Sequence, residues 1–197
     1  MDKYYKVFSL FLVKNNIIRQ NDCELYEYAI KVAVQGMINI IITFLIGCFF
    51  GMLKECLCML TVFFVMRKFA GGIHSKKYIY CLLSSEFLMF IALKIIKICI
   101  IHNFNLNFFI GIIIISSLVL ILLSPLENQN KLLSKHERKV YKLILIILTF
   151  MNLILIFYLV YVKSSLVYAF GAGQILTTIL LVCGYVLKCC QQKGRKI

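Results

Sequence analysis

Residues 67–81 gather the side chains of this sequence that are best suited to nucleophilic chemistry. They combine a basic pair, a double glycine, an imidazole and a thiol: Arg67-Lys68, Gly71-Gly72, His74 and Cys81. A cysteine attacks as its thiolate, a form that neighbouring cations and imidazole favour. His74 could take the proton from Cys81 and later return it to a leaving amine. The segment therefore predicts a catalytic His-Cys dyad.

The spacing of His74 and Cys81 places a condition on the elements that carry them. On one continuous helix, residues seven apart share a face but lie about 10.5 Å apart along the axis, beyond hydrogen-bond reach. The dyad therefore requires a break, which the double glycine permits, with Ser75 as the predicted cap of a helix that carries Cys81 in its second turn. Ser85, one turn beyond Cys81, is the candidate hydrogen-bond donor of the site.

Other polar groups receive structural interpretations. Four residues have ligand chemistry for zinc, Cys56, Cys58, His74 and Cys81, but the first two are expected near the opposite membrane surface, so neither a metal nor a cofactor is predicted. The odd number of cysteines, nine, indicates reduced thiols. Glu86, inside an apolar stretch, is expected to pair with Lys94, Gln35 or Asn39.

The composition indicates that these residues belong to a lipid-embedded protein. Apolar residues make up 62% of the 197 residues and charged residues 15%, with one proline and a mean hydropathy of +0.92. These values exclude a disordered chain, a disulfide scaffold or a soluble nucleic-acid-binding domain as the main interpretation. The formal charge of +14 is interpreted as a topology signal, not as a sign of nucleic-acid binding. Without a recognisable cleavable signal peptide, the first span is expected to direct insertion.

Apolar stretches predict the membrane spans. Four are of the length that crosses a bilayer, about 20 residues: 78–101, 106–124, 141–162 and 166–187. Residues 29–66 form a longer block that predicts two helices, with Gly47 and Gly51 easing the turn between them.

The basic residues predict how these spans are oriented. Along the chain, the successive groups of basic residues number four, one, four, two, five, one and four, an alternation that fits six spans. Both termini, His74 and Cys81 are then cytoplasmic. Residues 1–28 are expected to form an amphipathic helix in the cytoplasmic interface, with a frayed polar tail as the alternative. The predicted fold is an all-α integral membrane protein, with residues 29–197 as one polytopic domain.

With these elements in place, the motif resembles that of the accessory gene regulator B (AgrB) peptidases of Gram-positive bacteria. The resemblance rests on Arg67-Lys68-x-x-Gly71-Gly72-x-His74-x6-Cys81 between two spans, and it extends over nearly the whole chain in span number and loop order. Residues 124–134 are similar to the family's second recognisable loop and hold the single proline and the pair Asn130-Lys131. Leu132 stands where family members often have a second proline.

The resemblance implies a function and a set of site residues. It implies a membrane-embedded cysteine endopeptidase that cuts the C-terminal tail from a small AgrD-like pro-peptide through a thioester acyl-enzyme, leading to a cyclic thiolactone or lactone quorum-sensing peptide. The expected catalytic pair is His74 and Cys81; the expected supporting or substrate-binding residues are Arg67, Gly71, Gly72, Ser85 and Lys131. The resemblance also implies the cell membrane of a Gram-positive bacterium and allows a homodimer. The basic loops either attract an acidic peptide tail or act only as topology signals.

Two interpretations from other classes remain open. A non-enzymatic small transporter or peptide-export partner would leave His74 and Cys81 incidental and would depend on intramembrane polar groups: Gln35, Asn39, Glu86 and Gln174. A sensor or assembly subunit would bind its partner through the N-terminal helix. The peptidase is preferred because it alone uses the glycines, the histidine and the cysteine together.

Overall fold

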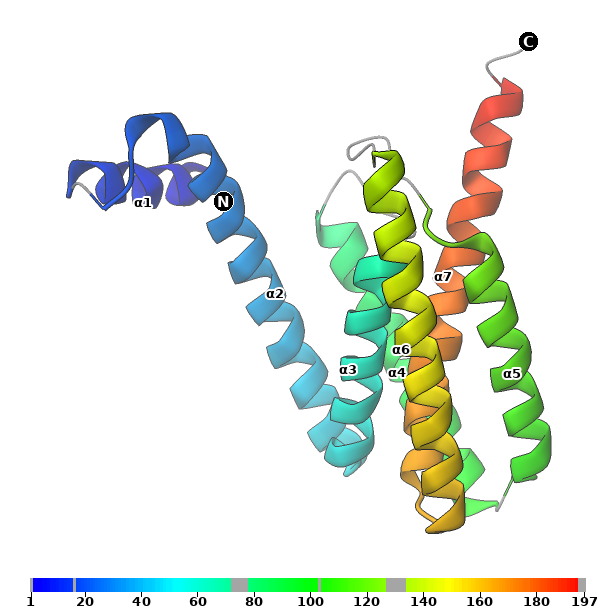
Figure 1. The fold of residues 1–197 in the computed structure, drawn as a ribbon. Coiled ribbons are helices and arrows are strands. Elements are labelled where there is room, and N and C mark those ends of the chain that lie inside the picture. The colour runs from blue at the N-terminus through cyan, green and yellow to red at the C-terminus, as the bar shows by residue number, and fades with distance from the viewer. Residues whose placement is uncertain (1, 16, 72–77, 103, 127–133, 195–197) are drawn as a thin grey trace. The chain divides into compact units, whose positions relative to one another are not determined.

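A computed structural model describes residues 2–15, 17–71, 78–102, 104–126 and 134–194. Across these residues the protein is all-helical, with seven α-helices and one short 3-10 helix (Figure 1). The α-helices are α1 (Asp2–Lys14), α2 (Cys23–Phe50), α3 (Leu53–Ala70), α4 (Tyr78–Ile101), α5 (Leu106–Leu123), α6 (Lys135–Tyr161) and α7 (Leu166–Gly194); the 3-10 helix is Gln20–Asp22. The predicted all-α class is confirmed.

The chain forms two compact units, residues 1–43 and residues 44–197. In the first unit, Cys23 Sγ at the start of α2 donates a hydrogen bond to Ser9 Oγ of α1 over 3.4 Å. Large apolar side chains of α1 are exposed, among them Tyr4, Phe8 and Phe11. The N-terminal segment is thus a helix and not a frayed tail, whereas its position in the membrane interface stays a prediction.

The long apolar block of residues 29–66 divides into α2 and α3, as its length predicts. Gly51, with a φ of 66°, follows the last residue of α2. Its N–H donates to the Cys48 carbonyl, and the N–H of Met52 donates to the Gly47 carbonyl, both over 3.0 Å. This pair of hydrogen bonds is a Schellman motif, which closes a helix around a left-handed residue and suits glycine at that position.

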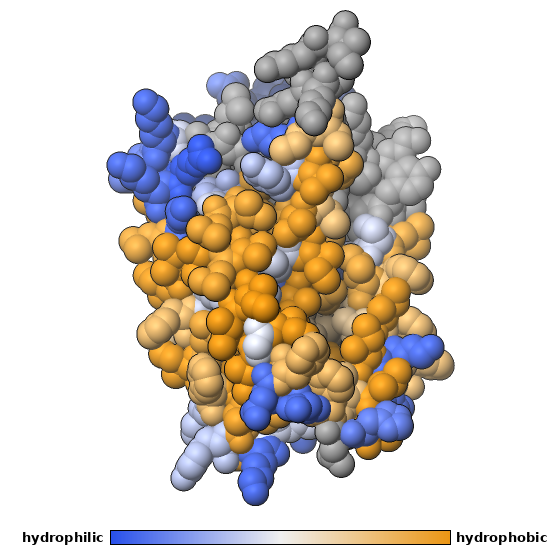
Figure 2. Space-filling view, turned by 90° about the vertical axis from the view of Figure 1, so that its right-hand side faces the viewer, coloured by the Kyte–Doolittle hydropathy of each residue, from blue (hydrophilic) through white to orange (hydrophobic). Residues whose placement is uncertain are grey.

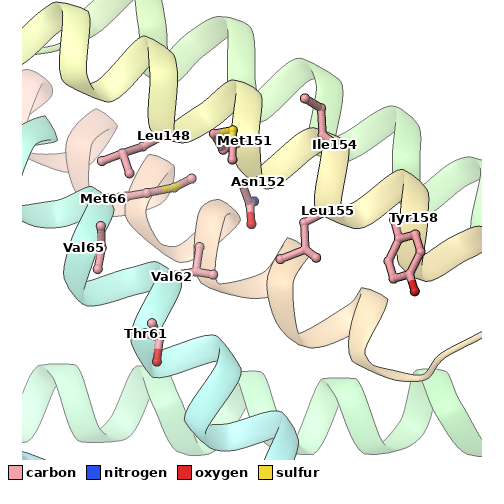
Figure 3. A pocket seen from close by; sticks show the side chains of 10 residues that line it. All are labelled: Thr61, Val62, Val65, Met66, Leu148, Met151, Asn152, Ile154, Leu155 and Tyr158. Atoms are coloured by element: carbon pink, nitrogen blue, oxygen red, sulfur yellow. The ribbon is translucent and has the colours of Figure 1, made fainter.

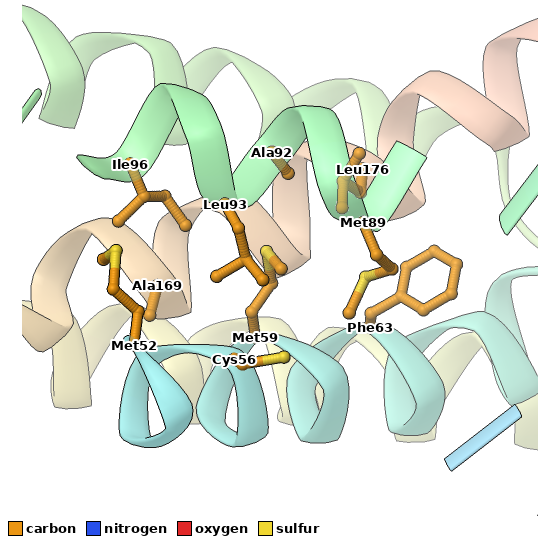
Figure 4. Packing of buried hydrophobic residues seen from close by; sticks show 10 residues of the cluster. All are labelled: Met52, Cys56, Met59, Phe63, Met89, Ala92, Leu93, Ile96, Ala169 and Leu176. Carbon is orange, nitrogen blue, oxygen red and sulfur yellow. The ribbon is translucent and has the colours of Figure 1, made fainter. Parts of the chain in front are cut away.

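Helix α7 is the centre of the second unit and contacts α3, α4, α5 and α6. The approach to α3 is close, because a Cβ atom on Gly173 would meet the Met59 carbonyl oxygen at 2.7 Å. The largest buried cluster joins α3, α4 and α7 (Figure 4): Met52, Cys56, Met59, Phe63, Met89, Ala92, Leu93, Ile96, Ala169 and Leu176. This part of the core therefore combines apolar side chains of different sizes from α3, α4 and α7.

Among the described residues, four helical stretches are long and apolar enough to cross a membrane: Gln20–Phe50, Leu106–Leu123, Lys135–Tyr161 and Leu166–Cys190. Figure 2 shows a broad hydrophobic surface on the face turned to the viewer, with hydrophilic residues gathered toward its two ends. Helices α3 and α4 are long as well, but charged residues interrupt or flank their apolar stretches. The membrane class is confirmed, and the count of six spans stays a prediction.

Helix α6 begins well before the apolar stretch predicted at residues 141–162. Ser134 Oγ accepts a hydrogen bond from the Glu137 N–H over 3.2 Å, and Glu137 Oε2 accepts one from the Ser134 N–H over 2.8 Å. This capping box starts the helix in a polar sequence. Apolar length predicts what crosses the bilayer, whereas capping decides where the helix starts.

Candidate functional site

The predicted dyad falls partly outside the described residues. His74, Gly72, Lys131 and the predicted cap Ser75 all lie in segments that the structure does not describe. Cys81 lies on α4, whose described part begins at Tyr78, and the expected cap at Ser75 lies outside the described residues. The dyad itself stays a prediction.

The basic pair of the motif lies in the last turn of α3. The guanidinium of half-buried Arg67 lies over the Phe63 ring, 5.4 Å from its centroid. The ammonium of exposed Lys68 lies 5.8 Å from the Phe69 ring centroid. Cations at a helix C-terminus interact favourably with the helix dipole, so the dipole of α3 stabilises the charges of Arg67 and Lys68.

Beyond α3, the backbone of Gly71 lies against that of Leu126, which follows α5. Leu126 N–H donates to the Ala70 carbonyl oxygen over 2.9 Å, and Gly71 and Leu126 form an isolated parallel β-bridge. A Cβ atom on Gly71 would collide with the Leu126 carbonyl oxygen. The structure thus joins the described beginnings of the two segments on which the family resemblance rests, residues 67–81 and 124–134.

The Leu126 side of this contact is anchored in the core. Leu126 packs against a buried cluster drawn from α3, α5, α6 and α7: Val62, Met66, Ala70, Leu120, Leu145 and Leu181. At the end of α5 the Ser124 N–H donates to the Leu120 carbonyl over 3.2 Å. The Ser124 hydroxyl oxygen is buried and has no hydrogen-bond partner in the described part of the chain. The Ser124-Pro125 peptide bond is cis.

Two further predicted polar residues lie on α4. The hydroxyl of half-buried Ser85 donates to the Leu82 carbonyl of the same helix over 2.9 Å, and its predicted role in the site stays untested. Glu86 is buried, with 8% of its surface exposed. Its proposed pairing with Lys94, Gln35 or Asn39 also stays a prediction. Within the described ranges, no three His, Cys, Asp or Glu side chains lie close enough together to hold a metal ion.

Gln174 of α7, a polar residue of the transporter interpretation, is fully buried and bonded inside the protein. Its Nε2 donates to Ser117 Oγ over 2.6 Å and to Ser116 Oγ over 3.0 Å, while its Oε1 accepts from Asn152 Nδ2 over 2.8 Å. Sequence reasoning did not identify Asn152 or the two serines. The sequence feature that could have identified these three residues is that they belong to the small set of polar residues inside the apolar spans.

A pocket of about 480 Å³ lies between α3 and α6 (Figure 3). Its lining is almost entirely apolar: Thr61, Val62, Val65, Met66, Leu148, Met151, Asn152, Ile154, Leu155 and Tyr158. None of the predicted site residues lines this pocket. Its apolar character fits contact with lipid better than peptide-bond chemistry.

Comparisons with known proteins agree with the resemblance seen in the motifs. The family described as Accessory gene regulator B matches residues 6–182. An AgrB-like protein of Clostridium beijerinckii is 30% identical over 81% of this chain and 78% of its own length. Accessory gene regulator protein B of Staphylococcus haemolyticus is 22% identical over 80% of this chain and 82% of its own length.

The coverage is smaller for another relative. An AgrB-like protein of Clostridium perfringens strain SM101 is 28% identical over 59% of this chain, and the match spans 56% of that protein's length. No solved structure shows a significant match to this chain. The family match includes both motif segments described above.

Proposed function

Because this chain belongs to the accessory gene regulator B family, we propose that it is a membrane-embedded cysteine endopeptidase that removes the C-terminal tail of a small AgrD-like pro-peptide. The observation that carries this proposal is the backbone contact between Gly71 and Leu126 in a chain of this family. This contact brings together the beginnings of the two motif segments, one of which holds His74 and Cys81 and the other Lys131.

The chemistry follows from the residue types. The Cys81 thiolate attacks the carbonyl carbon of the scissile peptide bond, the C–N bond breaks, and His74 supplies the proton that the departing amine needs. The tail leaves with a free amino group, and the remaining peptide is held as a thioester on Cys81. A thioester retains enough acyl-transfer potential for a second nucleophile of the peptide to attack it.

Ring closure completes the proposed reaction. An internal thiol or hydroxyl of the peptide gives its proton to His74 and attacks the thioester carbonyl. A new thiolactone or lactone bond forms, the bond to Cys81 breaks, and the Cys81 thiolate is released. Hydrolysis by water would instead give a linear product. A partly desolvated site at the membrane surface would limit the access of water, which favours cyclisation.

Selective alkylation of the cysteines tests the proposed dyad without a peptide. We expect iodoacetamide to label Cys81 in the purified, detergent-solubilised protein well below the ordinary thiol range, which lies near about pH 8.5. The variant His74→Ala should move this labelling up to the ordinary range, because the imidazole that favours the thiolate is lost. Exposed Cys190, which follows the predicted span 166–187, serves as the internal comparison thiol.

Co-expression with an AgrD-type pro-peptide tests the reaction itself. We expect Cys81→Ala and His74→Ala each to abolish release of the C-terminal tail, measured by mass spectrometry of the peptide. Cys183→Ala is the matched control, because it removes an exposed thiol from α7. Normal processing by Cys81→Ala would exclude the proposed mechanism and favour the transporter or export interpretation.

A further inference from the structure

The contact between the end of α3 and the segment after α5, here called the clasp, consists of Ala70, Gly71 and Leu126. Gly71 has a φ of 77° and a ψ of −158°. This region of backbone conformation is essentially restricted to glycine. Because a Cβ atom would also meet the Leu126 carbonyl oxygen, position 71 requires glycine for its conformation and for its close approach.

The clasp is held by main-chain groups and supported by a buried core. The Leu126 N–H bonds to the carbonyl of Ala70, a residue with no exposed surface. Leu126 and Ala70 belong to the same packed cluster, which also includes Leu120 of α5. The contact is thus supported by four helices of the second unit, α3, α5, α6 and α7, and does not depend on a long polar side chain.

The clasp lies a short distance along the chain from the proposed chemistry. His74 follows Gly71 by three residues, and Lys131 follows Leu126 by five. With at most about 3.6 Å per residue, the Cα of His74 stays within about 11 Å of that of Gly71, and the Cα of Lys131 within about 18 Å of that of Leu126. The clasp therefore holds one end of each of the two segments.

We propose that the clasp positions the segment carrying His74 for the reaction, and that Gly71 is a positioning residue that acts through its backbone. The inference rests on the proposed peptidase function. It assigns to the Gly71–Leu126 contact a role separate from acid-base chemistry, substrate charge and metal binding. In this role Gly71 contacts neither the peptide nor the reacting atoms. Its backbone limits the positions that the His74 side chain can occupy.

Substitution of Gly71 by alanine tests this role. We expect Gly71→Ala to open the clasp and to lower the rate of pro-peptide processing on the order of 100-fold, the loss that a displacement of about 1 Å can cause. The Cys81 alkylation profile should also move toward that of an ordinary thiol. A purely structural role would lower the melting temperature and leave this profile unchanged.

Two matched variants separate the causes. Gly51→Ala introduces a side chain at a φ of 66°, but nothing lies within 4 Å of its Cβ position. Gly111→Ala adds a methyl group in open space within α5. We expect both to process the pro-peptide within about threefold of the unchanged protein.

Hydrogen exchange of the Leu126 amide in the full-length protein reports the clasp independently of activity. Slow exchange in the unchanged protein, at least tenfold faster exchange in Gly71→Ala and a parallel loss of processing would support the proposal. Rapid exchange in the unchanged protein would overturn the clasp itself. Faster exchange with normal processing would overturn its positioning role. Normal processing of the pro-peptide by Cys81→Ala is a distinct result, because it would reject the peptidase function and the positioning role together. In that case the Leu126 amide would still exchange slowly.

Discussion

At the scale of single residues, the buried amide of Gln174 distinguishes two interpretations of the polar groups within the spans. A residue that lines a transport path must present its polar atoms to that path. Gln174 instead uses both ends of its amide within the protein, bonding to Asn152 of α6 and to Ser116 and Ser117 of α5. The hydrogen bonds that join α5, α6 and α7 therefore explain why a polar residue stands at position 174.

We expect Gln174→Leu to lower the free energy of unfolding by about 1–2 kcal/mol, because the buried Asn152 Nδ2 loses its acceptor. The two serine hydroxyls keep the Ile113 carbonyl as an acceptor, each over 2.8 Å, so they add little to the loss. Thermal unfolding in detergent micelles measures the effect. The double variant with Asn152→Leu should recover part of the loss, and strictly additive effects would contradict this pairing.

At the scale of elements, the first two turns of α6 carry an electrostatic conflict. Four exposed basic residues recur there at helical spacing: Lys135, Arg138, Lys139 and Lys142. Cations at a helix N-terminus interact unfavourably with the helix dipole. The helix dipole does not account for the charges of its first turn, and membrane topology and recognition of an acidic peptide tail are two physical roles for the basic residues.

Charge reversal separates these two roles. If the basic residues bind the peptide, Lys131→Glu combined with Lys135→Glu should lower pro-peptide processing about tenfold or more, with the topology unchanged and the effect weakened at high salt. Lys163→Glu, between α6 and α7, is the control at the other end of α6. Unchanged processing in the double variant would leave topology as the only role of these charges.

At the scale of the whole molecule, the central question is how many helices cross the bilayer. Four described helical stretches meet the length and composition needed for a span, and α3 and α4 would complete the predicted six. Helix α3 packs closely on α7 through Gly173, and α4 joins it in the same buried cluster. Two helices buried against a membrane-spanning helix are expected to lie at the same depth despite their charged ends.

Fusions to alkaline phosphatase test the six-span topology. The enzyme needs disulfides and is active only outside the cytoplasm. We expect activity for fusions after Lys54 and Lys163 and none for a fusion after Lys139, because the basic-rich segments stay inside. A fusion at the C-terminus should also be inactive. An inactive fusion after Lys54 would contradict the crossing of α2 and α3 as a hairpin.

The sequence by itself determined the class of the protein and the order of its helices. A segment within a bilayer must satisfy its own backbone hydrogen bonds, so apolar runs of about 20 residues predict helices with little dependence on their surroundings. The length of residues 29–66 likewise predicted two helices, and the motif pointed to the family that the comparisons then showed. The start of α6 was missed because its first turns are polar and depend on the capping box of Ser134.

Only the tertiary structure decided which faces of these helices meet. A helix such as α5 is apolar nearly all the way round, so its sequence contains little signal for its rotation. The pairing of Gln174 with Asn152 and the contact of Gly71 with Leu126 both join different elements. Such contacts depend on the rotation and depth of whole helices, which packing around α7 sets. For that reason the sequence identified the two motif segments separately, and the fold brought their beginnings together.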